Sequence, residues 1–185
     1  MKDLSLFFRR APAVEFRGPA YRLCVSLYRN RTLSMSGAWN RGGRYNIRNY
    51  FGALYTSLDL ATAHAEMCRY FTVEPDCGLT QAVIDLELTR VVDLTGRGLL
   101  RRIGIGLVDL VHESHAVCQG FWLRAWESGV EGLLVPPAAV HGRKNLVVLL
   151  DNQQTGWSIR LRRLEAAKLL TPVRTAPALR PPESS

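Results

Sequence analysis

The stretch from Gly42 to Glu66, GGRYNIRNYFGALYTSLDLATAHAE, constrains this chain more than any other part of the sequence. The pair Gly42-Gly43 permits backbone angles, or a close approach of a ligand, that a Cβ atom would forbid. It presents Arg44, whose planar guanidinium can contact a phosphate group through two parallel hydrogen bonds. The opening of the stretch therefore predicts a turn that places an arginine beside an anion.

A short strand and a helix are predicted to follow this turn. Residues 51–56, FGALYT, favour a strand, and residues 61–71 favour a helix whose first turn is capped by Ser57 or Asp59. Tyr55 belongs to the strand, and its ring can stack on a flat ligand. Turn, strand and helix together resemble the wall of a small-molecule pocket.

Glu66 completes this arrangement about two turns into the predicted helix. The helix face formed by Ala61, Ala63 and Ala65 is small enough to approach a sheet closely. A carboxylate pointing inward from such a helix loses favourable hydration, so it needs a compensating role. We interpret the stretch as the floor of a nucleotide pocket.

A nucleic-acid interpretation competes with this one. Residues 29–49 are rich in Arg, Asn, Ser and Gly, with Trp39, Tyr45 and Tyr50 nearby, and this composition predicts a ligand-binding loop rather than regular structure. Basic loops with interleaved aromatic residues also stack nucleic-acid bases. The same residues are therefore compatible with a non-catalytic module that binds nucleic acid or nucleotides.

Composition is compatible with both interpretations. The chain of 185 residues has a formal net charge of +8 and a sequence pI of about 9.8, which favours an anionic partner. Only Lys2, Lys144 and Lys168 of the 24 basic residues are lysines, so part of the arginine excess can reflect genomic composition. Its 47% hydrophobic content suffices for one sizeable core.

Compartment and cofactor class follow from what the sequence lacks. The four cysteines show no metal-ligand spacing, so we expect free thiols and no metal site. The N-terminal sixteen residues carry too short an apolar segment for a signal peptide, and no run of 18 apolar residues occurs. These features predict a cytoplasmic protein without a membrane partner.

The remaining segments predict a mixed α/β domain. Strands are expected over residues 21–27, 80–94, 132–136 and 145–150, a helix over 109–126, and a strand start followed by a basic amphipathic helix over 157–170. On the strand 80–94, Asp85 and Glu87 share a polar face, and we expect them to be solvated rather than catalytic. Residues 1–19 are expected to form an arm, 20–170 the domain, and 171–185 a proline-rich disordered tail.

Several motifs in order resemble the RES domain, a family found largely as toxins of bacterial toxin–antitoxin pairs. The resemblance covers roughly residues 20 to 150 and is carried by short motifs, which are AYR at 20–22, SGA at 36–38, GGRYN at 42–46, LY at 54–55, Glu66, DLT at 93–95, Gln119, GVEGLLVP at 129–136 and NLVV at 145–148. GGRYN with its spaced Tyr and Glu is the most specific part.

The resemblance implies an α/β (α+β) fold with a split mixed sheet like that of ADP-ribosyltransferases, and NAD as the substrate. Glu66 would stabilise the cation formed when the nicotinamide–ribose bond breaks, and Arg22 and Arg44 would hold pyrophosphate or an inorganic phosphate nucleophile. Tyr55 would pack on nicotinamide. Tyr45 and Gln119 would line the pocket. The family also implies a helix-turn-helix antitoxin as partner, and a homodimer is compatible with the sequence.

One position departs from the family. Relatives usually carry a serine after the strand that ends at Val135-Pro136, followed by an arginine, whereas this chain has Pro137 and then Ala138. Proline has neither a hydroxyl nor an amide hydrogen to donate. The sequence therefore leaves open phosphorolysis, hydrolysis and ADP-ribosyl transfer, as well as a weakened descendant that still binds the dinucleotide.

Overall fold

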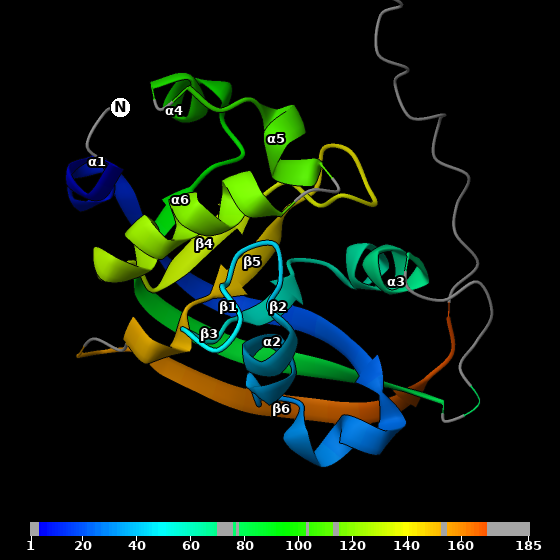
Figure 1. Ribbon diagram of the computed structural model, residues 1–185. Coiled ribbons are helices and arrows are strands. Elements are labelled where there is room, and N and C mark those ends of the chain that lie inside the picture. The colour runs from blue at the N-terminus through cyan, green and yellow to red at the C-terminus, as the bar shows by residue number, and fades with distance from the viewer. Residues whose placement is uncertain are drawn as a thin grey trace, which may run out of the picture.

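The computed structural model describes residues 4–69, 76, 78–102, 104–112, 115–152 and 155–169. Its six strands belong to one mixed sheet with the order β1-β2-β5-β4-β3-β6 (Figure 1). The strands are β1 (Ala13–Val25), β2 (Leu54–Ser57), β3 (Leu79–Asp93), β4 (Gly132–Val135), β5 (Asn145–Val148) and β6 (Ser158–Ala167). Strands β3 and β4 run parallel, and the other neighbours run antiparallel. The predicted mixed α/β fold is confirmed.

Strand β3 organises the sheet because three strands pair with it. Strand β1 pairs along one edge of β3 for nearly its whole length. The other edge pairs first with β6, over residues 79–87, and then with β4, over residues 91–93. The sheet therefore divides along one edge of a single long strand. A single further pair, Tyr21 with Ser57, joins β1 to β2 on the far side.

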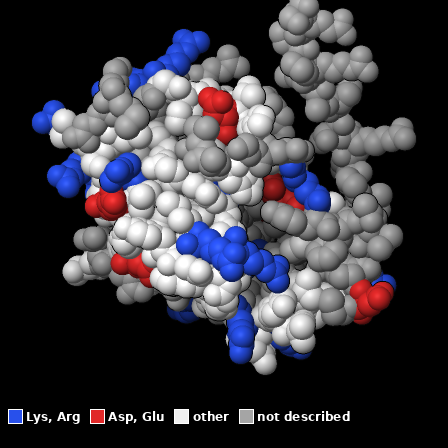
Figure 2. Space-filling model, in the orientation of Figure 1, with Lys and Arg blue, Asp and Glu red and all other residues white. Residues whose placement is uncertain are grey.

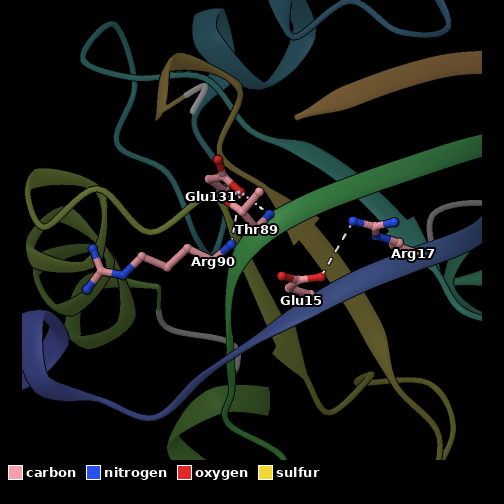
Figure 3. Close-up of polar contacts among 5 residues, drawn as sticks. All are labelled: Glu15, Arg17, Thr89, Arg90 and Glu131. Carbon is pink, nitrogen blue, oxygen red and sulfur yellow. Dashed lines mark hydrogen bonds and ion pairs between the residues drawn. The ribbon is translucent and has the colours of Figure 1, made fainter. Parts of the chain in front are cut away.

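A buried carboxylate holds the point at which β3 changes partner. Glu131, which is fully buried, accepts hydrogen bonds at Oε2 from the backbone N–H of Thr89 at 2.5 Å and of Arg90 at 3.0 Å. The Thr89 hydroxyl donates to the same oxygen at 3.1 Å, and Figure 3 shows the three residues converging. Backbone groups in a gap between strands need partners when buried, and Glu131 supplies them. The exposed pair of Glu15 and Arg17 in the same view lies 3.6 Å apart on β1.

Helices cover the two faces unequally. They are α1 (Leu4–Arg10), η1 (Ser26–Arg31), α2 (Ser36–Arg41), α3 (Leu60–Cys68), α4 (Arg97–Arg102), α5 (Leu107–Val111), α6 (Ala116–Glu127) and η2 (Leu150–Asn152). In Figure 1, α6 crosses β4 and β5, and its Trp122 packs with Phe8 of α1 and Leu133 of β4 in the largest apolar core. A second core fills the space between the two parts of the sheet. Helix α3 packs on β1 through a small third core around Leu23 and Ala63.

Four boundaries differ from the sequence prediction. Residues 158–167 continue as β6 rather than becoming a helix, because pairing with β3 outweighs their helical tendency. The helix expected over 109–126 is divided into α5 and α6 around His112. Residues 29–49 contain the short helical turns η1 and α2, and β1 starts at Ala13 instead of residue 21. The predicted tail over 171–185 lies outside the described residues.

Two smaller observations concern chemistry and compartment. Of the described cysteines, Cys24, Cys68 and Cys118 are free thiols. No helix in the described part of the chain has the length and apolar character needed to cross a membrane.

Candidate active site around Glu66

The glycine turn predicted from the sequence is locked from several sides. The Gly43 N–H donates to the Asn46 carbonyl at 3.1 Å, and the Gln119 side chain donates to the Gly43 carbonyl at 2.9 Å. The Tyr55 hydroxyl accepts from the Tyr45 N–H at 3.0 Å and donates to Asn46 Oδ1 at 2.8 Å. A Cβ on Gly43 would lie 2.4 Å from the Tyr55 hydroxyl oxygen, so only glycine fits at this position.

Arg44 and Tyr45 leave this turn in different directions. The Arg44 guanidinium donates to the carbonyl of His112, between α5 and α6. Tyr45 is buried, with its ring edge-on to Trp122 and its hydroxyl donating to the Leu110 carbonyl at 3.2 Å. Burial raises the pKa of the Tyr45 phenol well above its usual range, so the group stays neutral. Tyr45 thus anchors the turn in the core, and Arg44 remains at its rim.

Glu66 lies where α3 meets the strand ends of β4 and β5. Its Oε1 accepts a hydrogen bond from the Ala139 N–H at 3.1 Å and one from the Asn145 side-chain amide at 3.4 Å. The side chain is half-buried, and its Oε2 accepts no hydrogen bond from the described residues. One carboxylate oxygen is therefore fixed in place while the other is available to a ligand.

The segment before Glu66 determines its position. Asp59 caps α3, with Oδ1 accepting from the Thr62 N–H at 2.8 Å. Ser57, the alternative cap, instead donates to Asn145 Oδ1 at 2.8 Å. The Asn145 side chain therefore bridges β2 and Glu66. Asn145 was not among the site residues predicted from the sequence. A polar residue at the start of an apolar strand could have pointed to it.

The loop that departs from the family pattern lies against α3. Pro137 is buried just after β4. The next two residues contact the helix, because Arg69 donates to the Ala138 carbonyl at 2.9 Å and the Ala139 N–H donates to Glu66. Position 137 is thus two residues from the amide that orients the Glu66 carboxylate.

Arg22 is half-buried on β1 and has no described contact with the other predicted site residues. In β1, Tyr21 and Leu23 pack toward α3, so Arg22 projects from the opposite face of the strand. Its Nη1 is buried and has no hydrogen-bond partner among the described residues, and burial lowers the pKa of the guanidinium. No described hydrogen bond or ion pair joins Arg22 to Arg44, Tyr55 or Glu66.

The other predicted site residues, which are Arg44, Tyr45, Tyr55, Glu66 and Gln119, are linked by hydrogen bonds or by charge. The pKa of Tyr45, raised first by burial, is also affected by the charges of Arg44 and Glu66. Tyr55 and Gln119 hold the turn that carries Arg44. No cluster of three metal-binding side chains occurs among the residues that the structure describes. The described contacts thus comprise a hydrogen-bonded glycine turn that carries Arg44 and a carboxylate, Glu66, that is oriented through one oxygen.

Comparison with known proteins gives the family. A crystal structure of the M. tuberculosis MbcT–MbcA toxin–antitoxin complex contains a chain with the same fold, at a TM-score of 0.78 and 22% sequence identity. The alignment covers 91% of this chain and 93% of that one. A search among curated proteins gave no significant match. The family model of the RES domain matches residues 19–168, most of the sequence, and the chain therefore belongs to the RES domain family.

Proposed function

We propose that this protein consumes NAD by cleaving the bond between nicotinamide and ribose. The single observation that carries the proposal is the Glu66 carboxylate, which is oriented through Oε1 by Ala139 and Asn145 while Oε2 stays available. Cleavage of this bond leaves positive charge on the ribose ring, as in glycoside hydrolysis. A fixed carboxylate beside that ring stabilises the charge as it develops, without reorganising during the reaction.

The arginines suit the other end of the substrate. We assign Arg44, at the rim of the glycine turn, to a phosphate of the dinucleotide, since its guanidinium can make two parallel hydrogen bonds to such a group. Arg22 holds a buried Nη1 that lacks a partner, and such a group costs free energy unless a ligand satisfies it. NAD is long enough to reach more than one face of the site. We infer that its pyrophosphate is shared between these two arginines.

Aromatic and amide side chains shape the nicotinamide end. We assign the face of Tyr55 to the nicotinamide ring, since its hydroxyl is already fixed by Asn46 and the ring is only half-buried. Gln119 and Tyr45 hold the glycine turn and line the pocket from behind. Their contribution is therefore mainly to position Arg44 and Tyr55.

The test is product analysis with purified protein and NAD, with and without inorganic phosphate. Hydrolysis gives nicotinamide and ADP-ribose, whereas phosphorolysis gives nicotinamide and ADP-ribose carrying a new phosphate on the anomeric carbon. ADP-ribosyl transfer gives a protein adduct. Because Pro137 removes the family hydroxyl, we expect the phosphate dependence to be weak. Absence of nicotinamide release under all conditions would overturn the proposal.

Family membership also supports a biological role. We propose that the chain is the toxin of a toxin–antitoxin pair and acts in the cytoplasm, where loss of NAD stops growth. The MbcT–MbcA structure is of such a complex, and the family leads us to expect a helix-turn-helix antitoxin here. Induced expression should lower cellular NAD before growth ceases, and the Glu66→Gln variant should do neither. Growth arrest with unchanged cellular NAD would show that toxicity does not depend on NAD cleavage.

A further inference from the structure

The surface around η1 and α2 carries an unusual charge pattern. Between Glu15 and Asp59 the sequence contains seven arginines and no acidic residue. Five of these arginines are exposed, namely Arg17 on β1 and those at positions 29, 31, 41 and 48 around η1 and α2. Figure 2 shows basic side chains from the middle of this face to its lower edge, with no acidic side chain drawn between them.

Aromatic and amide side chains accompany these arginines in a repeated grouping. Three exposed triplets each contain one aromatic residue, one arginine and one asparagine, and they are Tyr28-Arg29-Asn30, Trp39-Asn40-Arg41 and Arg48-Asn49-Tyr50. The aromatic side chains are 47%, 38% and 51% exposed in that order. The Tyr50 ring packs edge-on against Trp126, with the ring centroids 5.7 Å apart, whereas the rings of Tyr28 and Trp39 contact no other aromatic ring among the described residues. We refer to the nine residues as the triplet surface.

The fold places two of the triplets side by side. The Asn49 N–H donates to the Trp39 carbonyl at 2.9 Å, which joins the third triplet to α2. Arg48 lies against Gly42, where a Cβ would approach the Arg48 Cβ to 3.2 Å. The first triplet belongs to η1, four residues before α2 begins. The second and third triplets are therefore adjacent in space, and the first lies close to them in the sequence.

Its arginines differ from those on the neighbouring strand β6. No described carboxylate lies within ion-pair distance of the four arginines at positions 29, 31, 41 and 48. On β6, by contrast, Arg160 and Arg162 both pair with Asp85, and Arg163 pairs with Glu165. A general excess of arginine does not explain this contrast, because both regions share the same composition bias.

A hollow adjoins the first triplet. It has a volume of about 420 Å³ and is lined by residues 29–34 together with Leu161 and Leu164 of β6. This volume lies within the range of small-molecule sites, so a nucleobase with its sugar can enter it. Its lining combines Arg29 and Arg31 with the apolar side chains of Leu33, Leu161 and Leu164.

We propose that the triplet surface binds single-stranded nucleic acid. Arginines contact phosphates, exposed aromatic rings stack on unpaired bases, and asparagine amides hydrogen-bond to base edges. A duplex hides the faces of its bases, so it cannot use the rings. An acidic polypeptide would neutralise the arginines but offers no base faces or edges. This function goes beyond NAD cleavage and uses residues outside the Glu66 site.

The test is fluorescence anisotropy of the full chain with labelled dT20, rU20 and an abasic 20-mer of equal charge. We expect dT20 or rU20, or both, to bind at least tenfold more tightly than the abasic strand. Tyr28→Ala with Trp39→Ala should abolish that difference. Arg41→Gln with Arg48→Gln should weaken binding at least tenfold and reduce the slope of log K against log salt by about 1.4, at about 0.7 per lost phosphate contact on a single strand.

A matched control removes the same charge elsewhere. Arg160→Gln with Arg163→Gln should change oligonucleotide affinity less than threefold. An equal loss in this control would reduce the effect to net charge and overturn the proposal. Equal affinity for the abasic strand, or equally effective displacement by polyglutamate, would also overturn it, the latter in favour of an acidic protein partner. Nicotinamide release in these variants, assayed separately, should match the parent protein.

Discussion

Two inward-facing glutamates, Glu131 and Glu66, show how the same side chain serves different ends in this molecule. Glu131 is fully buried and accepts three hydrogen bonds at one oxygen, all from Thr89 and Arg90 of one strand. Glu66 is half-buried and accepts two longer hydrogen bonds, from a loop and from another strand. The donors to Glu131 hold a sheet together, whereas those to Glu66 only orient a carboxylate.

The difference lies in how much of each carboxylate is used by the protein. A buried acid whose donors are backbone groups of a strand edge satisfies groups that would otherwise be orphaned. A half-exposed acid with one oxygen left over retains charge that a ligand can use. We therefore expect substitutions at Glu131 to alter stability and substitutions at Glu66 to alter chemistry, and the following experiments test that separation.

The largest effect is expected from Glu131→Ala. The change leaves two part-buried N–H groups and a hydroxyl without this acceptor, and each charge-assisted hydrogen bond contributes about 1.5–3 kcal/mol. Because these contributions are not additive, we expect the free energy of unfolding to fall by about 3 kcal/mol, measured by urea titration. Glu131→Gln, which keeps one acceptor oxygen and the shape, serves as the control and should lose less. A loss below about 0.5 kcal/mol, the size of an ordinary surface change, would remove Glu131 from this structural role.

Glu66→Gln should have the opposite effect, with stability retained and catalysis lost. The amide keeps the shape and can still accept from Ala139, so we expect the free energy of unfolding to change by less than about 1 kcal/mol. The negative charge opposite the forming ribose cation is lost, and NAD turnover should fall at least about a hundredfold, with affinity for NAD within a few-fold. Turnover is measured by nicotinamide release and affinity by calorimetry. Turnover at the parental rate would make Glu66 a surface carboxylate of α3.

These two glutamates also differ in how far their roles could be predicted from the sequence. The Gly42–Glu66 stretch has a local signature, so its turn, its strand, the Asp59 cap and the candidate Glu66 could all be identified from spacing. Glu131 depends on where β3 exchanges β6 for β4, and that register is set by tertiary pairing between distant segments. The same pairing turned the basic segment 158–167 into a strand.

Arg22 illustrates the same limit within the candidate site. Alternation along residues 21–27 places Arg22 on the strand face opposite Tyr21 and Leu23, which contact α3. It does not place Arg22 relative to Glu66, because the position of α3 depends on the third core. Asn145 was overlooked for a related reason, since its contact with Glu66 joins β5 to a helix 79 residues away in sequence.

A smaller effect is expected from Arg44→Lys and Arg22→Lys, made singly. Lysine keeps the charge but cannot make two parallel hydrogen bonds to a phosphate, so each change should weaken NAD binding by about 1–3 kcal/mol. Calorimetry with NAD measures the loss, and Arg160→Lys on β6 is the matched control. Unchanged affinity in Arg22→Lys alone would confine the phosphate contact to Arg44, on the Glu66 side of β1. Unchanged affinity in both would remove these arginines from the site.

The smallest effect is expected from Pro137→Ser, which introduces the serine that the family resemblance leads us to expect in the loop beside Glu66. Position 137 lies two residues before the Ala139 amide that donates to Glu66, so a new hydroxyl would enter the region of the Oε1 contacts. Serine can donate from both its hydroxyl and its backbone N–H, whereas proline can donate from neither. We expect phosphate-dependent nicotinamide release to rise about threefold to tenfold, with unfolding by urea unchanged within about 1 kcal/mol. Pro137→Ala, which restores the amide without the hydroxyl, separates the two donors. If serine and alanine both leave the rate and its phosphate dependence at the parental level in a folded protein, the chemistry at Glu66 does not use a donor from this loop.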